Sequence, residues 1–330
     1  MGLARKVLKY LLTPAELLCQ QTVEIPEEVA GPVFIVGPPR SGTTLFYQSF
    51  IHRFQVGYLS NVMDWFPGRP CVGYKIQKLL LNRKSATSQV EPFRSQYGKT
   101  TGLLGPYEAG PFWYQWFPHG DDGIITGADL TSQNQNAMRR AVARLQRISG
   151  TPVVFKNVYN ILRIDALHTV FPTALFISIV RNPVEIAQSI LLARRKERSD
   201  SVSWWSVRPP NWQLVSDQPP IDQVAFQAVS LMQLMKTSFS LLPQGHHIQI
   251  AYKQFCFDPE GNMHEVDKFL ARKNVSLKKH HRLPEKFPYS GNPKLAPDEY
   301  EHLKQSVGKF LEMQNEILKS FGASDVDFPA

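Results

Sequence analysis

The chain has few of the features that define disulfide-rich, zinc-binding or membrane-spanning proteins. Its 330 residues include three cysteines, Cys19, Cys71 and Cys256, whose wide spacing argues against a disulfide framework and against a zinc-ligand pattern. No apolar stretch approaches the ~20 residues that a membrane-spanning helix needs. No acidic residue stands where it would obviously hold a divalent ion, so we expect no metal.

The chain also lacks an excess of acidic residues. It has 37 Lys and Arg against 28 Asp and Glu, which gives a formal net charge of +9. A basic balance favours an anionic partner, which could be nucleic acid, anionic lipid or a multiply charged nucleotide. The basic residues are scattered except at 194–198 and 278–282, and we see no nucleic-acid-binding module, so we expect no nucleic acid partner.

The N-terminal segment, residues 1–19, predicts a short amphipathic helix. Thr13-Pro14 and Glu16 interrupt its leucines, which is unlike a secretory signal. Two alternatives stay open for this helix, packing on the domain or peripheral contact with a membrane surface. The apolar content of 43% is typical of a globular protein, and we expect a cytoplasmic one.

Apolar runs alternate with helical patterns along the chain. The strand candidates are 33–37, 56–60, 152–156, 174–180 and 247–252. The helical patterns lie at 43–53, 133–149, 160–170, 183–197, 221–241, 260–272 and 297–321. This alternation predicts βαβ units and a mostly parallel sheet. The stretch 61–130 is rich in Gly, Pro and aromatic residues with weak periodicity, which predicts a long functional loop.

Residues 33–45 combine a short apolar run, a glycine-containing turn and the hydroxyl-rich start of a helix. Such a turn leaves backbone N–H groups at a helix N-terminus free to bind an anion. Gly37 and Gly42 have the spacing of the ATP- and GTP-binding loop G-x-x-x-x-G-K-[ST], but Thr43 stands where the lysine should be and the cation is Arg40. The loop is therefore a poor ATP or GTP site and suits a nucleotide with a differently placed anionic group.

A second phosphate-binding pattern follows the apolar run 174–180, which predicts a strand buried on both faces. Arg181 comes at the end of this run, where ligands bind in open α/β sheets. Pro183 then suits the first turn of a helix, and Ser189 lies about two helical turns along it. Arginine suits phosphate because its planar fork donates hydrogen bonds in pairs.

These motifs resemble those of sulfotransferases that use 3′-phosphoadenosine 5′-phosphosulfate (PAPS). Residues 39–44, Pro-Arg-Ser-Gly-Thr-Thr, resemble the family's loop for the 5′-phosphosulfate, and Arg181 with Ser189 resembles its clamp for the 3′-phosphate. The resemblance implies that PAPS is the co-substrate. It implies nucleotide contacts by Pro39, Arg40, Ser41, Gly42, Thr43, Thr44, Arg181 and Ser189.

Other segments extend the resemblance. Tyr252, followed by Asp258-Pro259, is similar to a family segment whose tyrosine lies near the adenine. Residues 289–295 resemble the family's C-terminal loop over the 3′-phosphate, which implies Ser290, Asn292 and Lys294 as donors. Lys156 ends a strand candidate where similar enzymes place a lysine against the transferring sulfuryl group.

The resemblance implies an α/β fold with a P-loop-like parallel sheet of about five strands flanked by helices. We expect a single sulfotransferase domain over 31–330, preceded by a helical extension over 1–30. The insert 61–130 would then form the acceptor-binding region. The acceptor could be a lipid, a glycolipid, a small alcohol or phenol, or a carbohydrate, and the aromatic stretch 107–117 is interpreted as one wall of its site.

Sulfuryl transfer to a hydroxyl or amine is an in-line displacement that needs cationic stabilisation and a base. Arg40 and Lys156 would supply the positive charge. Relatives with an arginine in the loop often carry a glutamate where this chain has Asn61, so the base must come from elsewhere.

Three residues are candidates for the base. Glu108 ranks first because its aromatic-rich loop could raise the pKa of its carboxyl group. Asp64 ranks second because it lies three residues after Asn61 and could reach the site if this segment forms a helical turn. His119 ranks third because histidine titrates near neutrality without help.

Two other functions stay open. A small-molecule P-loop kinase would also use such a loop, but Thr43 in place of the lysine opposes it. A non-catalytic nucleotide-binding protein could keep the loop and lose the base, and Asn61 keeps that alternative open.

Overall fold

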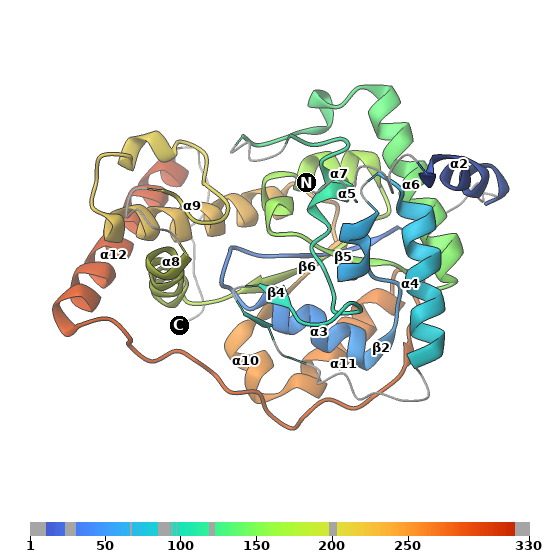
Figure 1. Cartoon of the computed structure of the whole chain (residues 1–330). Coiled ribbons are helices and arrows are strands. Elements are labelled where there is room, and N and C mark those ends of the chain that lie inside the picture. The colour runs from blue at the N-terminus through green and yellow to red at the C-terminus, as the bar shows by residue number, and fades with distance from the viewer. Residues whose placement is uncertain are drawn as a thin grey trace.

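A four-stranded parallel sheet lies at the centre of the part of the chain that is described (Figure 1). The computed structural model describes residues 11–23, 31–66, 68–84, 93, 95–96, 98–118, 123–197 and 203–320. The strand order is β5-β1-β6-β7. The strands are β1 (Val33–Val36), β5 (Val154–Lys156), β6 (Leu175–Val180) and β7 (His247–Ala251). Strands β1 and β6 are buried throughout, as expected for apolar runs in a parallel sheet covered on both faces.

The register brings the carboxyl ends of these strands to one edge. Lys156 lies opposite Ile35, Val36 lies opposite Ser178, and Val180 lies opposite Ala251. The segments that follow all four strands therefore leave the sheet at the same edge, which is where open α/β sheets bind their ligands.

Helices cover both faces of the sheet. The described helices are α2 (Thr13–Thr22), α3 (Thr43–Arg53), α4 (Pro70–Lys84), α5 (Gly110–Trp113), α6 (Ser132–Ser149), α7 (Ile164–Val170), α8 (Pro183–Glu197), α9 (Pro220–Ser240), α10 (Tyr252–Phe257), α11 (Pro259–Ala271) and α12 (Pro297–Ser320). None of the described helices is both long and apolar enough to cross a bilayer.

Alternate residues of the strands build two cores. Phe34 stacks between Phe155 and Phe176, with ring centroids 5.7 and 5.5 Å apart, and packs with α5, α6, α7 and α9. Ile35 and Ile177 point to the opposite face, where α3, α10 and α11 pack. This two-residue periodicity is the reason that one sheet supports helices on both sides.

Short elements complete the described residues. They are the 3₁₀ turns η1 (Asn61–Trp65), η2 (Gly127–Asp129), η3 (Val158–Leu162) and η4 (Trp212–Val215) and the two-residue strand pairs β2 (Phe54–Gln55) with β8 (Lys278–Lys279) and β3 (Ser95–Gln96) with β4 (Lys99–Thr100). The α/β class with a parallel sheet flanked by helices is confirmed.

The strand predicted at 56–60 is wrong. Gly57 makes one bridge to Val153 beside β5, and the pairing goes no further. The backbone N–H of Ser60 instead donates to Gln77 Oε1 at 3.0 Å, and its bridge partner is Pro106, which cannot donate to a ladder. Within the described residues the sheet therefore has four strands, with this segment attached at its edge.

The prediction of irregular structure throughout 61–130 is also wrong, because α4 lies inside it. The Glu16 carboxylate of α2 accepts hydrogen bonds from the backbone N–H groups of Cys71 and Val72, at 3.2 and 2.9 Å. These N–H groups lie at the start of α4, where they lack intrahelical partners. The helix is thus capped by a residue far away in the sequence, which a local pattern does not reveal.

Candidate functional site

The loop Gly37–Thr44, which we call the cradle, joins β1 to α3 at the carboxyl edge of the sheet. Its Gly42 has φ +102°, and a Cβ there would lie 2.1 Å from the Tyr252 ring, so only glycine fits. No side chain of the described residues caps α3, so its first N–H groups face the loop. The buried Ser41 hydroxyl has no hydrogen-bond partner among the described residues, which fits a site for ligand oxygens.

The cradle and the segment after β6 contact each other directly. Arg181 Nη1 donates a hydrogen bond to the carbonyl oxygen of Arg40 at 3.1 Å. Arg40 Nε in turn donates to Ser189 Oγ at 3.0 Å. The two motifs that the sequence suggested for two different phosphates therefore form one continuous surface.

Arg181 is held from several sides. Its Nε donates to Glu185 Oε2 at 2.7 Å, and its Nη2 donates to the carbonyl oxygen of Ser290 at 2.5 Å. Its guanidinium carbon lies 4.9 Å from the centroid of the Tyr252 ring, close enough for a cation–π contact. With the bond to the cradle, three of the five guanidinium N–H donors are used within the described residues, and two are left for a ligand.

Residues 289–294, which we call the strap, are fastened to α8. Gln188 Nε2 donates to the carbonyl oxygen of Asn292 at 3.1 Å, and Gln188 Oε1 accepts from the backbone N–H of Lys294 at 2.7 Å. Lys294 Nζ donates to Ser290 Oγ at 2.6 Å. The strap therefore lies over the Arg181 end of the site, with its own lysine beside it.

Sequence reasoning missed three residues that hold this arrangement, Glu185, Gln188 and Tyr289. The Tyr289 hydroxyl donates to Glu185 Oε1 at 2.5 Å while Glu185 Oε2 pairs with Arg181. Burial, followed by the nearby Glu185 carboxylate, raises the pKa of the Tyr289 phenol. Helical spacing could have found the first two, because they lie four and seven residues after Arg181, on the helix face that carries Ser189.

The second half of the site is built around Lys156, the last residue of β5. Its buried amino group forms an ion pair with Glu108 and donates to Thr44 Oγ1 at 3.3 Å. Glu108 Oε2 also accepts from the backbone N–H of Val158 at 3.3 Å. Lys156 therefore connects the carboxylate to the cradle.

Glu108 belongs to an irregular loop between β4 and α5, residues 101–109, which we call the Glu108 loop. Its carbonyl oxygen accepts from Asn157 Nδ2 at 3.0 Å, and the next residue, Ala109, has φ +52°. A Cβ on Gly98 would lie 3.8 Å from both Glu108 Oε1 and Thr44 Oγ1, so Gly98 lies beside the ion pair. The Glu108 side chain is 27% exposed, which leaves it accessible to a small molecule.

The other candidates for the base differ from Glu108. Asp64 Oδ1 accepts from the Tyr107 hydroxyl at 3.1 Å, and burial together with this carboxylate raises the pKa of the Tyr107 phenol. His119 lies outside the described residues. Asn61 has a structural task, because its Nδ2 donates to the carbonyl oxygens of Thr100 and Gly102, at 3.1 and 2.7 Å, and so holds the Glu108 loop.

The interpretation of 107–117 as an acceptor wall is wrong for its most buried members. Trp113 and Phe117 belong to the sheet core, at 0% and 2% exposure, and cannot contact a ligand. Tyr107 and Phe112 line a small recess with Met63 and Phe66, so part of the stretch does border a cavity.

Comparison with known proteins now identifies the family. The model of the sulfotransferase family matches residues 32–273. The chain belongs to the sulfotransferase family. A search among curated proteins finds no match to it.

Several solved sulfotransferase structures align with this sulfotransferase. STF1 from Mycobacterium tuberculosis is 15% identical over 95% of this chain and 80% of its own, with a TM-score of 0.47. STF9 from Mycobacterium avium is 14% identical over 93% and 73%, with a TM-score of 0.47. A sulfotransferase from Alicyclobacillus acidocaldarius is 13% identical over 88% and 96%, with a TM-score of 0.44. The family assignment rests on the sequence match.

Proposed function

We propose that this sulfotransferase moves the sulfuryl group of PAPS to a hydroxyl or amine of an acceptor, with Glu108 as the base. The contact that carries the proposal is made by Lys156, whose amino group reaches both Thr44 of the cradle and the Glu108 carboxylate. A donor held by the cradle would present its sulfuryl group to Lys156, and the acceptor would meet Glu108 on the other side.

The proposed nucleotide contacts follow the same arrangement. The N–H groups at the start of α3 and the unpartnered Ser41 hydroxyl suit the 5′-phosphosulfate, with Arg40 beside them. The two remaining N–H donors of Arg181 suit the 3′-phosphate, together with Ser189. The strap adds Ser290, Asn292 and Lys294 to that end, and Tyr252 packs between the two phosphate sites, where the adenosine would lie.

The proposed reaction is an in-line displacement at sulfur. The acceptor oxygen or nitrogen forms a bond to sulfur while the bond from sulfur to the phosphate oxygen breaks. The electron pair leaves with 3′-phosphoadenosine 5′-phosphate (PAP), and the acceptor proton passes to a Glu108 oxygen. Lys156 and Arg40 stabilise the negative charge on the sulfuryl oxygens and on the leaving phosphate, and the fixed ion pair keeps the base in place.

A transfer assay tests the proposal. Labelled PAPS is offered with a panel of lipid, glycolipid, phenol or alcohol, and carbohydrate acceptors, and the label is followed into the acceptor. We expect transfer to one of these classes, and we expect Glu108→Gln to lose it while still binding PAP. Binding of PAP without transfer to any acceptor would favour the non-catalytic alternative. Transfer of phosphate from ATP with magnesium would favour the kinase.

A further inference from the structure

Two neighbouring helices, α4 and α6, carry positive charge only. Within α4 the charged residues are Lys75, Lys78, Arg83 and Lys84, and within α6 they are Arg139, Arg140, Arg144 and Arg147. Neither helix contains Asp or Glu. The two helices pack side by side at one edge of the molecule (Figure 1).

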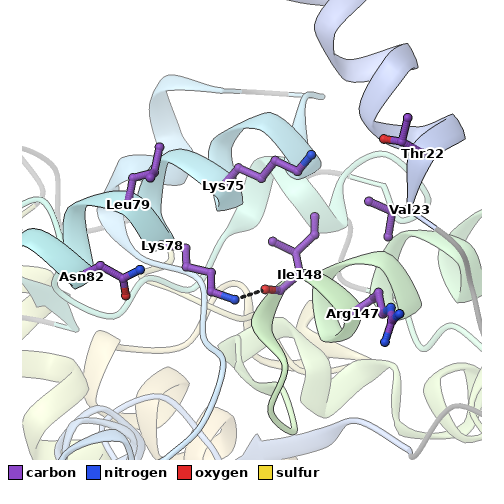
Figure 2. Close-up of a pocket in the computed structure, with 8 residues that line it drawn as sticks. All are labelled: Thr22, Val23, Lys75, Lys78, Leu79, Asn82, Arg147 and Ile148. Atoms are coloured by element: carbon purple, nitrogen blue, oxygen red, sulfur yellow. Dashed lines mark hydrogen bonds between the residues drawn. The ribbon is translucent and has the colours of Figure 1, made fainter.

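A cavity of about 580 Å³ lies between α4, α6 and the end of α2. Figure 2 shows its lining from these three elements, which consists of Thr22, Val23, Lys75, Lys78, Leu79, Asn82, Arg147 and Ile148. Lys78 Nζ donates to the carbonyl oxygen of Ile148 at 2.6 Å, so this amino group caps a carbonyl near the end of α6. Lys75 and Arg147 are exposed and have no hydrogen bond or ion pair within the described residues, which leaves two cations for a ligand.

Large apolar side chains are exposed on or next to α2 and α4, two of the elements that line this cavity. Leu11, just before α2, is 71% exposed, Leu17 and Leu18 of α2 are 54% and 61% exposed, and Leu79 of α4 is 60% exposed. Glu16, on the same helix α2, is buried in contact with α4, so the helix is docked by one side while its leucines remain in solvent. Exposed leucines beside unpaired cations form a surface that is both apolar and basic.

We propose that α2, α4 and α6 form a docking surface for an anionic phospholipid membrane. The exposed leucines would enter the boundary between headgroups and acyl chains, as the apolar side chains of interfacial helices do. Lys75 and Arg147 would contact headgroup phosphates, since an anionic leaflet attracts basic side chains near its surface. A nucleic acid would bind the same cations, but it would offer the exposed leucines no apolar contact. Among the described residues, no aromatic side chain lines the cavity for base stacking.

Vesicle co-sedimentation of the full chain tests the proposal. We expect binding to vesicles that contain phosphatidylserine, weaker binding at high salt, and little binding to phosphatidylcholine alone. The pair Lys75→Gln and Arg147→Gln should weaken binding about 25-fold, because each basic side chain near an anionic surface contributes about fivefold. The pair Leu17→Ser and Leu18→Ser should weaken it about 10-fold or more through lost apolar burial.

A matched control removes the same charge elsewhere. Lys304 and Lys309 are exposed on α12, which lies at the opposite side of the molecule in Figure 1. Their replacement by glutamine should leave vesicle binding within about twofold, because these side chains would lie more than a screening length from the membrane. All these side chains are exposed, so the melting temperatures and PAP binding of the variants should match the parent protein.

Three results would overturn the proposal. The first is no binding to phosphatidylserine vesicles by the parent protein. The second is an equal loss of binding in the α12 control, which would mean that total charge alone matters. The third is binding of single-stranded RNA that the leucine pair leaves unchanged, with no vesicle binding, which would identify a polyanion site.

Discussion

The phosphate end and the carboxylate end of the site are built in different ways. The cradle and Arg181 each directly follow a fully buried strand, so the sheet sets the position of both backbones, although their side-chain contacts reach distant residues. Glu108 lies on an irregular loop and is positioned by Lys156, Asn157 and Val158 from β5 and the segment after it. The difference teaches that the sheet fixes the proposed nucleotide site, whereas long-range contacts fix the proposed base.

The largest expected effect is at the carboxylate end. Glu108→Gln should lower the rate of sulfuryl transfer about 1,000-fold, the usual range for loss of a positioned base, and leave the PAP dissociation constant within about twofold. Single-turnover transfer and calorimetric PAP titration measure the two values. A loss of PAP affinity as large as the loss of transfer rate would contradict separate roles for the two ends of the site.

Asp64→Asn is the matched control for this substitution, because it also neutralises a carboxylate in the same part of the chain. We expect less than about a tenfold loss of rate, since Asp64 acts on Tyr107 rather than on Lys156. A larger loss for Asp64→Asn than for Glu108→Gln would move the base to Asp64.

The next effect belongs to the phosphate end. Arg181→Ala should weaken PAP binding about 100-fold, because charge-assisted hydrogen bonds to a phosphate are lost. Binding of 5′-AMP, which lacks the 3′-phosphate, should change by less than about fivefold. Calorimetric titration with PAP and with 5′-AMP measures the two losses of affinity. An equal loss for the two would show that Arg181 only supports the cradle through Arg40.

Acid stability tests the sheet that both ends share. His247 of β7 hydrogen-bonds Ser178 Oγ at 2.8 Å and stacks on Phe239, and burial lowers its pKa from 6.5 to about 4. Between these values the unfolded chain binds the proton and the folded chain does not. The contribution of His247 is therefore complete above pH 6.5 and is lost as the pH falls toward 4, by on the order of 2 kcal/mol.

Denaturant titrations from pH 7.5 to pH 4 check this expectation. The variant His247→Gln should lose that part of the acid sensitivity, although His52 and His168, whose pKa values burial also lowers, will retain theirs. If the parent protein and the variant lost stability in parallel, His247 would have no part in the acid response.

The smallest effect expected concerns the strap. Gln188→Ala removes two hydrogen bonds to the strap, at Asn292 and Lys294, and should weaken PAP binding about 10-fold, mainly through faster dissociation. Stopped-flow release of PAP measures it. Gln305→Ala on the exposed side of α12 is the control and should change nothing. Unchanged release from Gln188→Ala would mean that the strap does not retain the nucleotide.

Much of the fold was predictable because its signals are local. The buried strands β1 and β6 are continuous apolar runs, and the helices that follow the cradle and Arg181 begin where the hydroxyl residues and Pro183 indicate. The cradle could be found because turn, glycine and helix start are contiguous.

The rest depended on contacts between distant residues. The cap of α4 comes from Glu16, and the Ser60 N–H that would extend a fifth strand goes to Gln77 instead. The aromatic-rich loop was enough to rank Glu108 first among the candidate bases. Its position beside Lys156 could not be predicted, because the two residues come from different segments that meet at the edge of the sheet. Asn61, which departs from the family pattern, proved to hold that loop.

The most direct test of the central claim is thermal stabilisation by PAP compared with ATP plus magnesium and with 5′-AMP. A ligand that binds only the folded state raises the melting temperature by an amount set by its concentration relative to its dissociation constant. At about 100 times that constant, PAP should add about 2.7 kcal/mol, a shift of several degrees, and the other two should add much less. A shift with ATP and magnesium but none with PAP would contradict the account.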